Sequence, residues 1–170
     1  MKKFIIAVLF CITVIPASQA TAGEFKMAGI VFSFPDDWSI TGQQDLDGEG
    51  YYLSCEKDGE NSSGLVSVAW VNDTRELEAT IGEYKQGLVN SFGEQGFEAD
   101  FSEIVKTTYR DFGAVKITYT LSIFGTDHTG ALYTFHACGK TVTVLTQGAV
   151  EDAKANANGF NTVWETFKCK

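Results

Sequence analysis

A short acidic segment is the part of this chain closest to a metal-binding pattern. Residues 45 to 50 read Asp-Leu-Asp-Gly-Glu-Gly, and Glu56 is the twelfth residue counted from Asp45. Acidic side chains at positions one, three, five and twelve, with glycine at position six, outline an EF-hand calcium loop. The calcium candidates are therefore Asp45, Asp47, Glu49 and Glu56.

Two features of this segment favour a solvated acidic loop over a calcium site. Glu49 stands where the EF-hand pattern has Asp or Asn, and residues 50 to 56 have the pattern of a strand rather than of a second helix. The glycines of the chain are dispersed and form no phosphate-binding motif. We therefore expect no metal and no cofactor.

The two histidines, His128 and His136, are the other candidates for catalysis or metal binding. His136 lies in a strand-like run, which favours a half-buried structural role. His128 follows Asp127 in a turn, and a triad with a serine is disfavoured because chain neighbours rarely face one another and no nucleophile elbow is present. The many carboxylates keep a carboxylate-based hydrolase as a less favoured alternative. We expect a protein that is not an enzyme.

The first twenty residues have the three-part pattern of a bacterial-type secretory signal peptide. Two lysines precede an unbroken apolar run over residues 4–15, and Ser18 and Ala20 supply the small side chains that a signal peptidase requires. The run is shorter than the about 20 residues of a membrane-spanning helix. We expect cleavage after Ala20, which would leave residues 21–170 as one periplasmic or secreted domain without membrane insertion.

Cleavage would make the chain more acidic and leave an odd number of cysteines. Loss of two lysines leaves 11 basic side chains against 22 acidic ones and lowers the net charge from −9 to about −11. Such a surface repels nucleic acid and attracts basic proteins. The remaining cysteines are Cys55, Cys138 and Cys169, so at most one internal disulfide is expected. They form no CxxC motif or Cys/His cluster, which argues against zinc or redox chemistry.

These residues are positioned by a chain whose patterns alternate between strands and two helices. The first helix is expected to open at Asp73, which forms a capping-box spacing with Glu76. The second spans roughly residues 151–167. The first helix has an apolar stripe formed by Leu77, Ile81, Tyr84, Leu88 and Phe92. Strands are expected before and after this helix in the chain, over residues 30–34, 51–55, 65–71, 104–111, 114–124, 131–138 and 142–147.

Strands without βαβ alternation predict an α+β fold. We expect an α/β/α sandwich, in which a largely antiparallel, twisted sheet of about six to seven strands is covered by two main helices. The last strand should extend roughly 30 Å from the Gly139 turn, and the returning helix covers about 27 Å. Cys169 should therefore come back to the level of Cys138. Cys138–Cys169 is the favoured disulfide, with Cys55 as a competing partner and no bridge as the third option.

The order of elements resembles the Mog1/PsbP-like fold. The resemblance covers nearly all of the mature chain, and its most specific piece is the run Phe32-Ser33-Phe34-Pro35-Asp36-Asp37-Trp38, followed later by a C-terminal helix with Trp164 and Phe167. Proteins of this fold mostly act as accessory or binding proteins. Some exported members look like immunity proteins that block a cell-wall hydrolase delivered by a type VI secretion system.

The leading functional hypothesis is a non-catalytic exported binding or accessory protein that acts through a protein partner. Its sharpest version is an immunity-type inhibitor whose acidic loop enters the basic groove of a wall hydrolase. The expected contact surface is formed by Asp45, Asp47, Glu49, Tyr51 and Tyr52, because tyrosine is enriched at interfaces. The alternative is a small-molecule or lipid carrier, with a pocket between sheet and helix lined by some of the thirteen phenylalanines.

Overall fold

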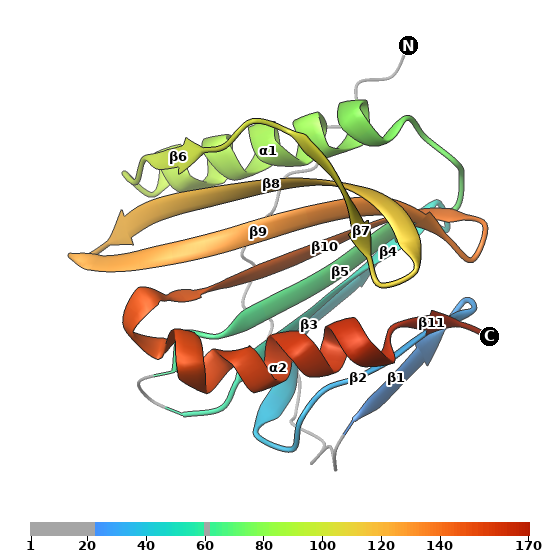
Figure 1. Ribbon diagram of the computed structural model, residues 1–170, viewed down its shortest axis with the longest axis horizontal. Coiled ribbons are helices and arrows are strands. Elements are labelled where there is room, and N and C mark those ends of the chain that lie inside the picture. The colour runs from blue at the N-terminus through green and yellow to red at the C-terminus, as the bar shows by residue number, and fades with distance from the viewer. Residues whose placement is uncertain (1–22, 60–61) are drawn as a thin grey trace.

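The computed structural model describes residues 23–59 and 62–170 of the chain. The expected signal peptide, residues 1–20, lies outside the described residues. Eleven strands, two α-helices and one 3₁₀ turn follow one another along the described chain (Figure 1). Their bounds are β1 Glu24–Met27, β2 Ile30–Ser33, β3 Trp38–Asp45, β4 Gly50–Lys57, β5 Leu65–Val71, α1 Leu77–Glu94, β6 Ala99–Phe101, β7 Val105–Tyr109, β8 Phe112–Ile123, β9 Thr126–Ala137, β10 Lys140–Ala149, η1 Val150–Asp152, α2 Ala153–Thr166 and β11 Lys168–Cys169.

Eight of these strands form one antiparallel sheet. The strand order is β3-β4-β5-β10-β9-β8-β6, and β7 pairs with β8 beyond the end of β6. The pairing of β5 with β10 brings the first and second halves of the chain together at the centre of the sheet. The fold is thus the expected α+β sandwich with an antiparallel sheet, and the sheet has eight strands rather than six or seven.

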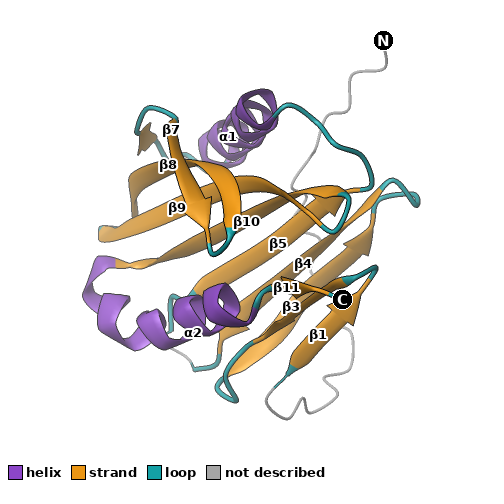
Figure 2. Ribbon diagram, turned by 45° about the vertical axis from the view of Figure 1, so that its right-hand side comes forward, coloured by secondary structure: helices purple, strands orange, loops and turns teal. Residues whose placement is uncertain are grey.

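A second, smaller sheet is formed by β1, β2 and β11, with β2 in the middle. It lies with α2 on one face of the large sheet, whereas α1 lies on the other face (Figure 2). The sequence patterns did not predict this small sheet, because two of its strands have only four residues and the third has two. Its third strand, β11, reaches β2 only because the chain returns along α2.

The alternation of side chains along the central strands produces two separate cores. In β10, Val142 and Val144 point toward α2, whereas Leu145 points toward α1. The α2-side core is rich in aromatic rings, including Trp38, which is 1% exposed. The α1-side core contains the helical stripe that the sequence predicted, because Ile81 and Phe92 are buried there with Leu77, Tyr84 and Leu88 packed around them.

Helix α1 begins three residues later than the capping-box spacing indicated. Glu76 is the N-cap, and its carboxylate accepts hydrogen bonds from the backbone N–H groups of Glu78 and Ala79. The backbone carbonyl of Asp73 instead accepts from the N–H and hydroxyl of Thr141 at 2.9 Å. The tertiary bond to β10 therefore holds residues 73 to 76 out of the helix.

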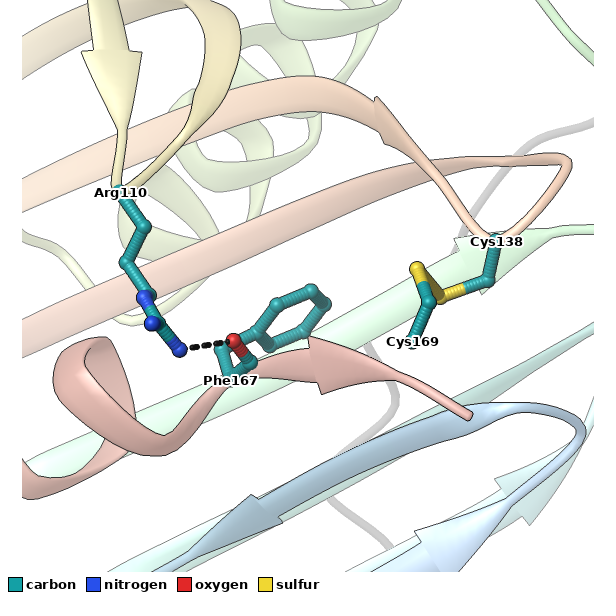
Figure 3. The surroundings of a disulfide bond; sticks show 4 residues. All are labelled: Arg110, Cys138, Phe167 and Cys169. Carbon is teal, nitrogen blue, oxygen red and sulfur yellow. Dashed lines mark hydrogen bonds between the residues drawn. A yellow bond between two sulfur atoms is a disulfide. The ribbon is translucent and has the colours of Figure 1, made fainter.

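The favoured disulfide is confirmed, because Cys138 in the β9–β10 turn is bonded to Cys169 in β11 (Figure 3). The same chain end is held by Arg110, whose guanidinium donates a 2.6 Å hydrogen bond to the carbonyl of Phe167. Cys55 carries a free thiol and is buried in the α2-side core. The bridge and the arginine together fasten β11 to the large sheet.

Candidate functional site

A hollow lies between α1 and the large sheet. Its volume is about 480 Å³, which falls within the range of about 300–1,000 Å³ usual for ligand pockets. Most of its surface is apolar, and it is partly open to solvent. The described lining residues are Tyr52, Leu65, Ser67, Glu83, Tyr84, Gly87, Leu88, Ser91, Phe92, Gln95, Phe97, Ile123, Phe124, Leu145 and Gln147.

Helix α1 forms one wall of this cavity with two neighbouring rows of residues. The first row is the apolar stripe that includes Tyr84, Leu88 and Phe92. The second row, Glu83, Gly87 and Ser91, is spaced at four-residue steps and therefore lies along one line of the helix. Small side chains at 87 and 91 leave space beside the apolar row, and this space becomes part of the cavity.

The sheet provides the opposite wall, through β4, β5 and β10. Tyr52 comes from β4, Leu65 and Ser67 from β5, and Leu145 and Gln147 from β10. Helix α1 packs mainly on β8 and β9. The helix is narrower than the sheet and does not fully cover β4, β5 and β10. The cavity lies over these strands, beside the helix.

The mouth of the cavity carries an exposed aromatic residue in an uncommon backbone conformation. Phe124 is 92% exposed, and it forms the β8–β9 turn with Gly125. Both residues have positive φ, +49° and +85°, as a type I′ turn requires. Phenylalanine is disfavoured there, since positive φ brings its Cβ close to the backbone. Phe97 packs against the Phe124 ring edge to face.

The polar groups of the cavity are mainly hydroxyls and amides. Burial raises the pKa of Tyr84, and the nearby Tyr52 adds to the increase. Burial likewise raises the pKa of Tyr52, an effect that the Ser54 and Ser67 hydroxyls partly offset. Both tyrosines are therefore neutral at pH 7. They can donate and accept hydrogen bonds without adding charge.

The amide of Gln147 is oriented by a neighbour outside the cavity. The hydroxyl of Tyr119 donates a 2.6 Å hydrogen bond to the Gln147 Oε1 atom. Burial raises the pKa of Tyr119, so this phenol stays protonated and remains a donor. With the oxygen held in this way, the NH₂ group is the donor that Gln147 can offer to a ligand.

The structure separates the four calcium candidates into two places. Asp45, Asp47 and Glu49 are exposed at the β3–β4 turn, where the Asp45 carboxylate accepts a 2.6 Å bond from the Gly48 N–H. Glu56 lies near the other end of β4 and accepts a bond from the hydroxyl of Thr41 at 3.0 Å. Within residues 23–59 and 62–170, no three acidic, histidine or cysteine side chains gather as a metal site.

The two tyrosines assigned to a partner surface point to opposite faces of the sheet. Tyr51 is 9% exposed, stacks on Trp70 in the α2-side core and donates a bond to Gln43. Tyr52 points to the α1 side, where it lines the cavity. The acidic residues at the turn and these two tyrosines therefore do not form one continuous surface.

The histidines lie outside the cavity. His136 was expected to be half-buried; it is exposed, and its Nε2 donates to the backbone carbonyl of Arg75 at 2.8 Å, which is a structural bond between β9 and the segment before α1. His128 falls within β9 rather than in the turn where the sequence placed it, and it is half-buried. Burial raises the pKa of the Cys55 thiol to about 12, so this cysteine is protonated and unreactive at neutral pH.

The sequence suggested a pocket between sheet and helix lined by some of the phenylalanines, without naming them. Tyr52 was assigned to a partner surface, and Tyr84, Leu88 and Phe92 to the apolar stripe of the helix. One signal was present in α1, where Gly87 and Ser91 adjoin the apolar stripe. A glycine inside a helix costs about 1 kcal/mol relative to alanine. Such a residue beside a buried stripe indicates that space is needed there.

Comparison with known proteins identifies the fold. No protein-family model matches the chain, and no curated protein sequence matches it. Among solved structures, it is similar to cyanobacterial PsbP (CyanoP) from Synechocystis sp. PCC 6803, with 15% identity, a TM-score of 0.57 and coverage of 91% of this chain and 96% of that one. The chain therefore has a PsbP-like fold, as the Mog1/PsbP-like resemblance implied.

Two further structures are similar. A protein of Bacteroides thetaiotaomicron aligns at 12% identity with a TM-score of 0.56, over 88% of this chain and 49% of that protein, so this chain spans about half of its length. LpqN, involved in cell envelope biogenesis of Mycobacterium tuberculosis, aligns at 14% identity with a TM-score of 0.43, over 82% of each chain. Within the described ranges, no helix is both long and apolar enough to cross a membrane.

Proposed function

We propose that the protein is a non-catalytic, exported accessory protein that binds a small apolar ligand in the cavity beside α1. The observation that carries this proposal is the cavity itself, with a volume of about 480 Å³ and a mainly apolar lining. A hollow of this kind in a folded domain is the first candidate for a ligand site, since an unfilled apolar cavity lowers stability. The proposal selects the carrier alternative over the protein-partner hypothesis.

The chemistry of the lining favours binding over catalysis. The described lining residues include one carboxylate, that of Glu83, and no histidine, cysteine, lysine or arginine. Acid–base catalysis by carboxylates requires two groups with separated pKa values, and nucleophilic catalysis requires an activated nucleophile. Hydroxyls and amides that remain neutral are suited to orienting a ligand.

Export is supported by the signal-peptide pattern of residues 1–20 and by the disulfide between Cys138 and Cys169. Structural disulfides form and persist in oxidising compartments outside the cytoplasm. A binding protein in such a compartment can capture an apolar molecule that water dissolves poorly. This role needs no nucleotide and no metal.

The test is titration of the purified mature protein with N-phenylnaphthylamine, a neutral probe whose fluorescence rises in apolar surroundings. We expect saturable binding with one probe per protein. Gly87→Leu should abolish it, because the new side chain enters the cavity while the helix propensity of the position improves. Gly82→Leu is the matched control, since a Cβ at Gly82 meets nothing within 4 Å. Equal probe binding by both variants would overturn the proposal.

The acidic β3–β4 turn supports a second candidate function, which is binding of a basic protein partner. Asp45, Asp47 and Glu49 are exposed together, and the Asp45–Gly48 bond gives the turn a defined shape. An inhibitor of the immunity type would use such a turn to enter a basic groove. Affinity capture from a periplasmic extract should recover a basic protein with the native chain and lose it when the three acids are replaced by their amides. Recovery that is unchanged by this replacement counts against the second candidate.

A further inference from the structure

We infer that the cavity selects an uncharged amphipathic ligand and rejects anionic ones, and that Glu83 sets this selectivity. The inference rests on the proposed ligand-binding function and names its substrate class. Glu83 is the only charged residue among the described lining residues. A carboxylate at the edge of an apolar cavity repels an anionic head group placed in the same hollow.

The position of Glu83 explains why it acts on a ligand in the cavity. Glu83, Gly87 and Ser91 follow one line of α1, so the carboxylate begins the row whose small members make room for a ligand. Glu83 is exposed, which places its charge at the solvent side of the hollow. A ligand whose apolar part lies beside Gly87 therefore brings its polar end near Glu83 or near the hydroxyl-bearing wall.

No cation of α1 compensates this charge within the cavity. Lys85, two residues along the helix, lies over the ring of Phe101 at 5.2 Å from its centre and is not among the lining residues. Binding of a fatty acid or another anion usually requires an arginine or lysine near the carboxylate or phosphate. The described lining offers none.

The opposite wall offers neutral hydrogen-bonding groups to a ligand. The Tyr52 and Ser67 side chains reach the cavity from β4 and β5, and the Gln147 amide reaches it from β10 with its oxygen already engaged by Tyr119. A hydroxyl, ether or amide on the ligand can be accommodated there without burial of a charge. The combination matches a molecule with an apolar body and an uncharged polar head.

The test compares two probes that differ in one charge. N-phenylnaphthylamine is neutral, and anilinonaphthalene sulfonate has the same aromatic body with a sulfonate. The titrations are made at about 0.15 M salt, where distant surface charges are largely screened. We expect the neutral probe to bind the native protein at least about tenfold more tightly than the sulfonate. A difference of this size corresponds to one close repulsion, between the sulfonate and the Glu83 carboxylate. Glu83→Gln should strengthen sulfonate binding far more than it changes neutral-probe binding, and so remove most of the difference in affinity between the two probes.

Glu165→Gln is the matched control, because it removes the same charge from the exposed face of α2, on the other side of the sheet. It should leave the affinities of both probes unchanged. The inference would be overturned if both probes bound the native protein with equal affinity, or if the two substitutions had equal effects. In either case, saturable binding of the neutral probe would still support the proposed function. Absence of neutral-probe binding to the native protein would overturn both.

Discussion

The rings of Phe97 and Phe124 lie edge to face at the mouth of the α1-side cavity, with their centroids 5.3 Å apart. Phe97 follows the end of α1, and Phe124 is at the tip of the β8–β9 hairpin. The pair thus joins the two elements that frame the opening. Phe124 remains 92% exposed despite this contact, so the contact alone does not account for a phenylalanine in a disfavoured backbone conformation. Residues held in such conformations concentrate at functional sites.

Phe124→Asn should therefore stabilise the protein and weaken ligand binding. Asn-Gly is the preferred pair for a type I′ turn, and relief of the positive φ at a phenylalanine should raise the free energy of unfolding by about 1 kcal/mol. Loss of the ring removes an apolar part of the cavity mouth, so we expect several-fold weaker binding of N-phenylnaphthylamine. Urea unfolding and probe titration measure the two effects. A stabilised variant with unchanged probe affinity would show that Phe124 has no part in binding.

Substitution of two helical glycines by alanine should have effects of opposite sign. Gly159 in α2 faces Trp38, and a Cβ at this position would overlap the indole ring. Trp38 is buried in the α2-side core, so Gly159→Ala should lower the free energy of unfolding by about 1–3 kcal/mol through overpacking. Gly82→Ala meets no neighbour, so it should raise that free energy by up to about 1 kcal/mol. Stabilisation by both substitutions, measured by urea unfolding, would contradict the packing of α2 on Trp38.

Removal of the disulfide should destabilise the whole domain. The bond closes a loop of 31 residues, for which the chain-entropy relation gives about 3–4 kcal/mol. Cys138→Ser combined with Cys169→Ser should therefore lower the unfolding midpoint in urea. Amide exchange should accelerate first at positions 168 and 169, which pair with β2. Cys55→Ala, which keeps the bridge, is the control. If amide exchange accelerated only at β11 and the urea midpoint did not change, the bridge would stabilise only the chain end.

The sequence predicted the parts of this fold that depend on local patterns. The α1 stripe from Leu77 to Phe92 and the pairing of Cys138 with Cys169 follow from periodicity and element length, and both are found. The start of α1 was misplaced, because the bonds of Asp73 to Thr141 join segments 68 residues apart. The cavity was anticipated only as a class of site, since its residues are set by how far α1 extends across the sheet. No pattern within α1 specifies that distance.

The stability of the protein should fall at alkaline pH, and Cys55 should account for part of the loss. Burial, with a smaller contribution from Glu56, raises the pKa of the Cys55 thiol from 9.0 to about 12 in the folded chain. Between these values the unfolded chain loses the thiol proton while the folded chain keeps it, so the free energy of unfolding decreases as pH rises, by at most about 1.4 kcal/mol per pH unit for this group. Buried Tyr84, Tyr109 and Tyr119 act in the same direction above pH 10, because their pKa values are also raised.

Urea unfolding of the native chain and of Cys55→Ala at intervals from pH 7 to 10.5 separates the cysteine from the tyrosines. The alanine variant should lose stability less steeply between pH 9 and 10, where only the thiol differs, and should follow the native slope above pH 10, where the tyrosines titrate in both chains. The small void left by alanine lowers stability equally at every pH and does not affect the slope. Mass analysis after each measurement verifies that Cys138 and Cys169 remain bonded. Identical slopes from pH 9 to 10 would mean that the Cys55 thiol is accessible enough to ionise in the folded protein, contrary to its position in the α2-side core.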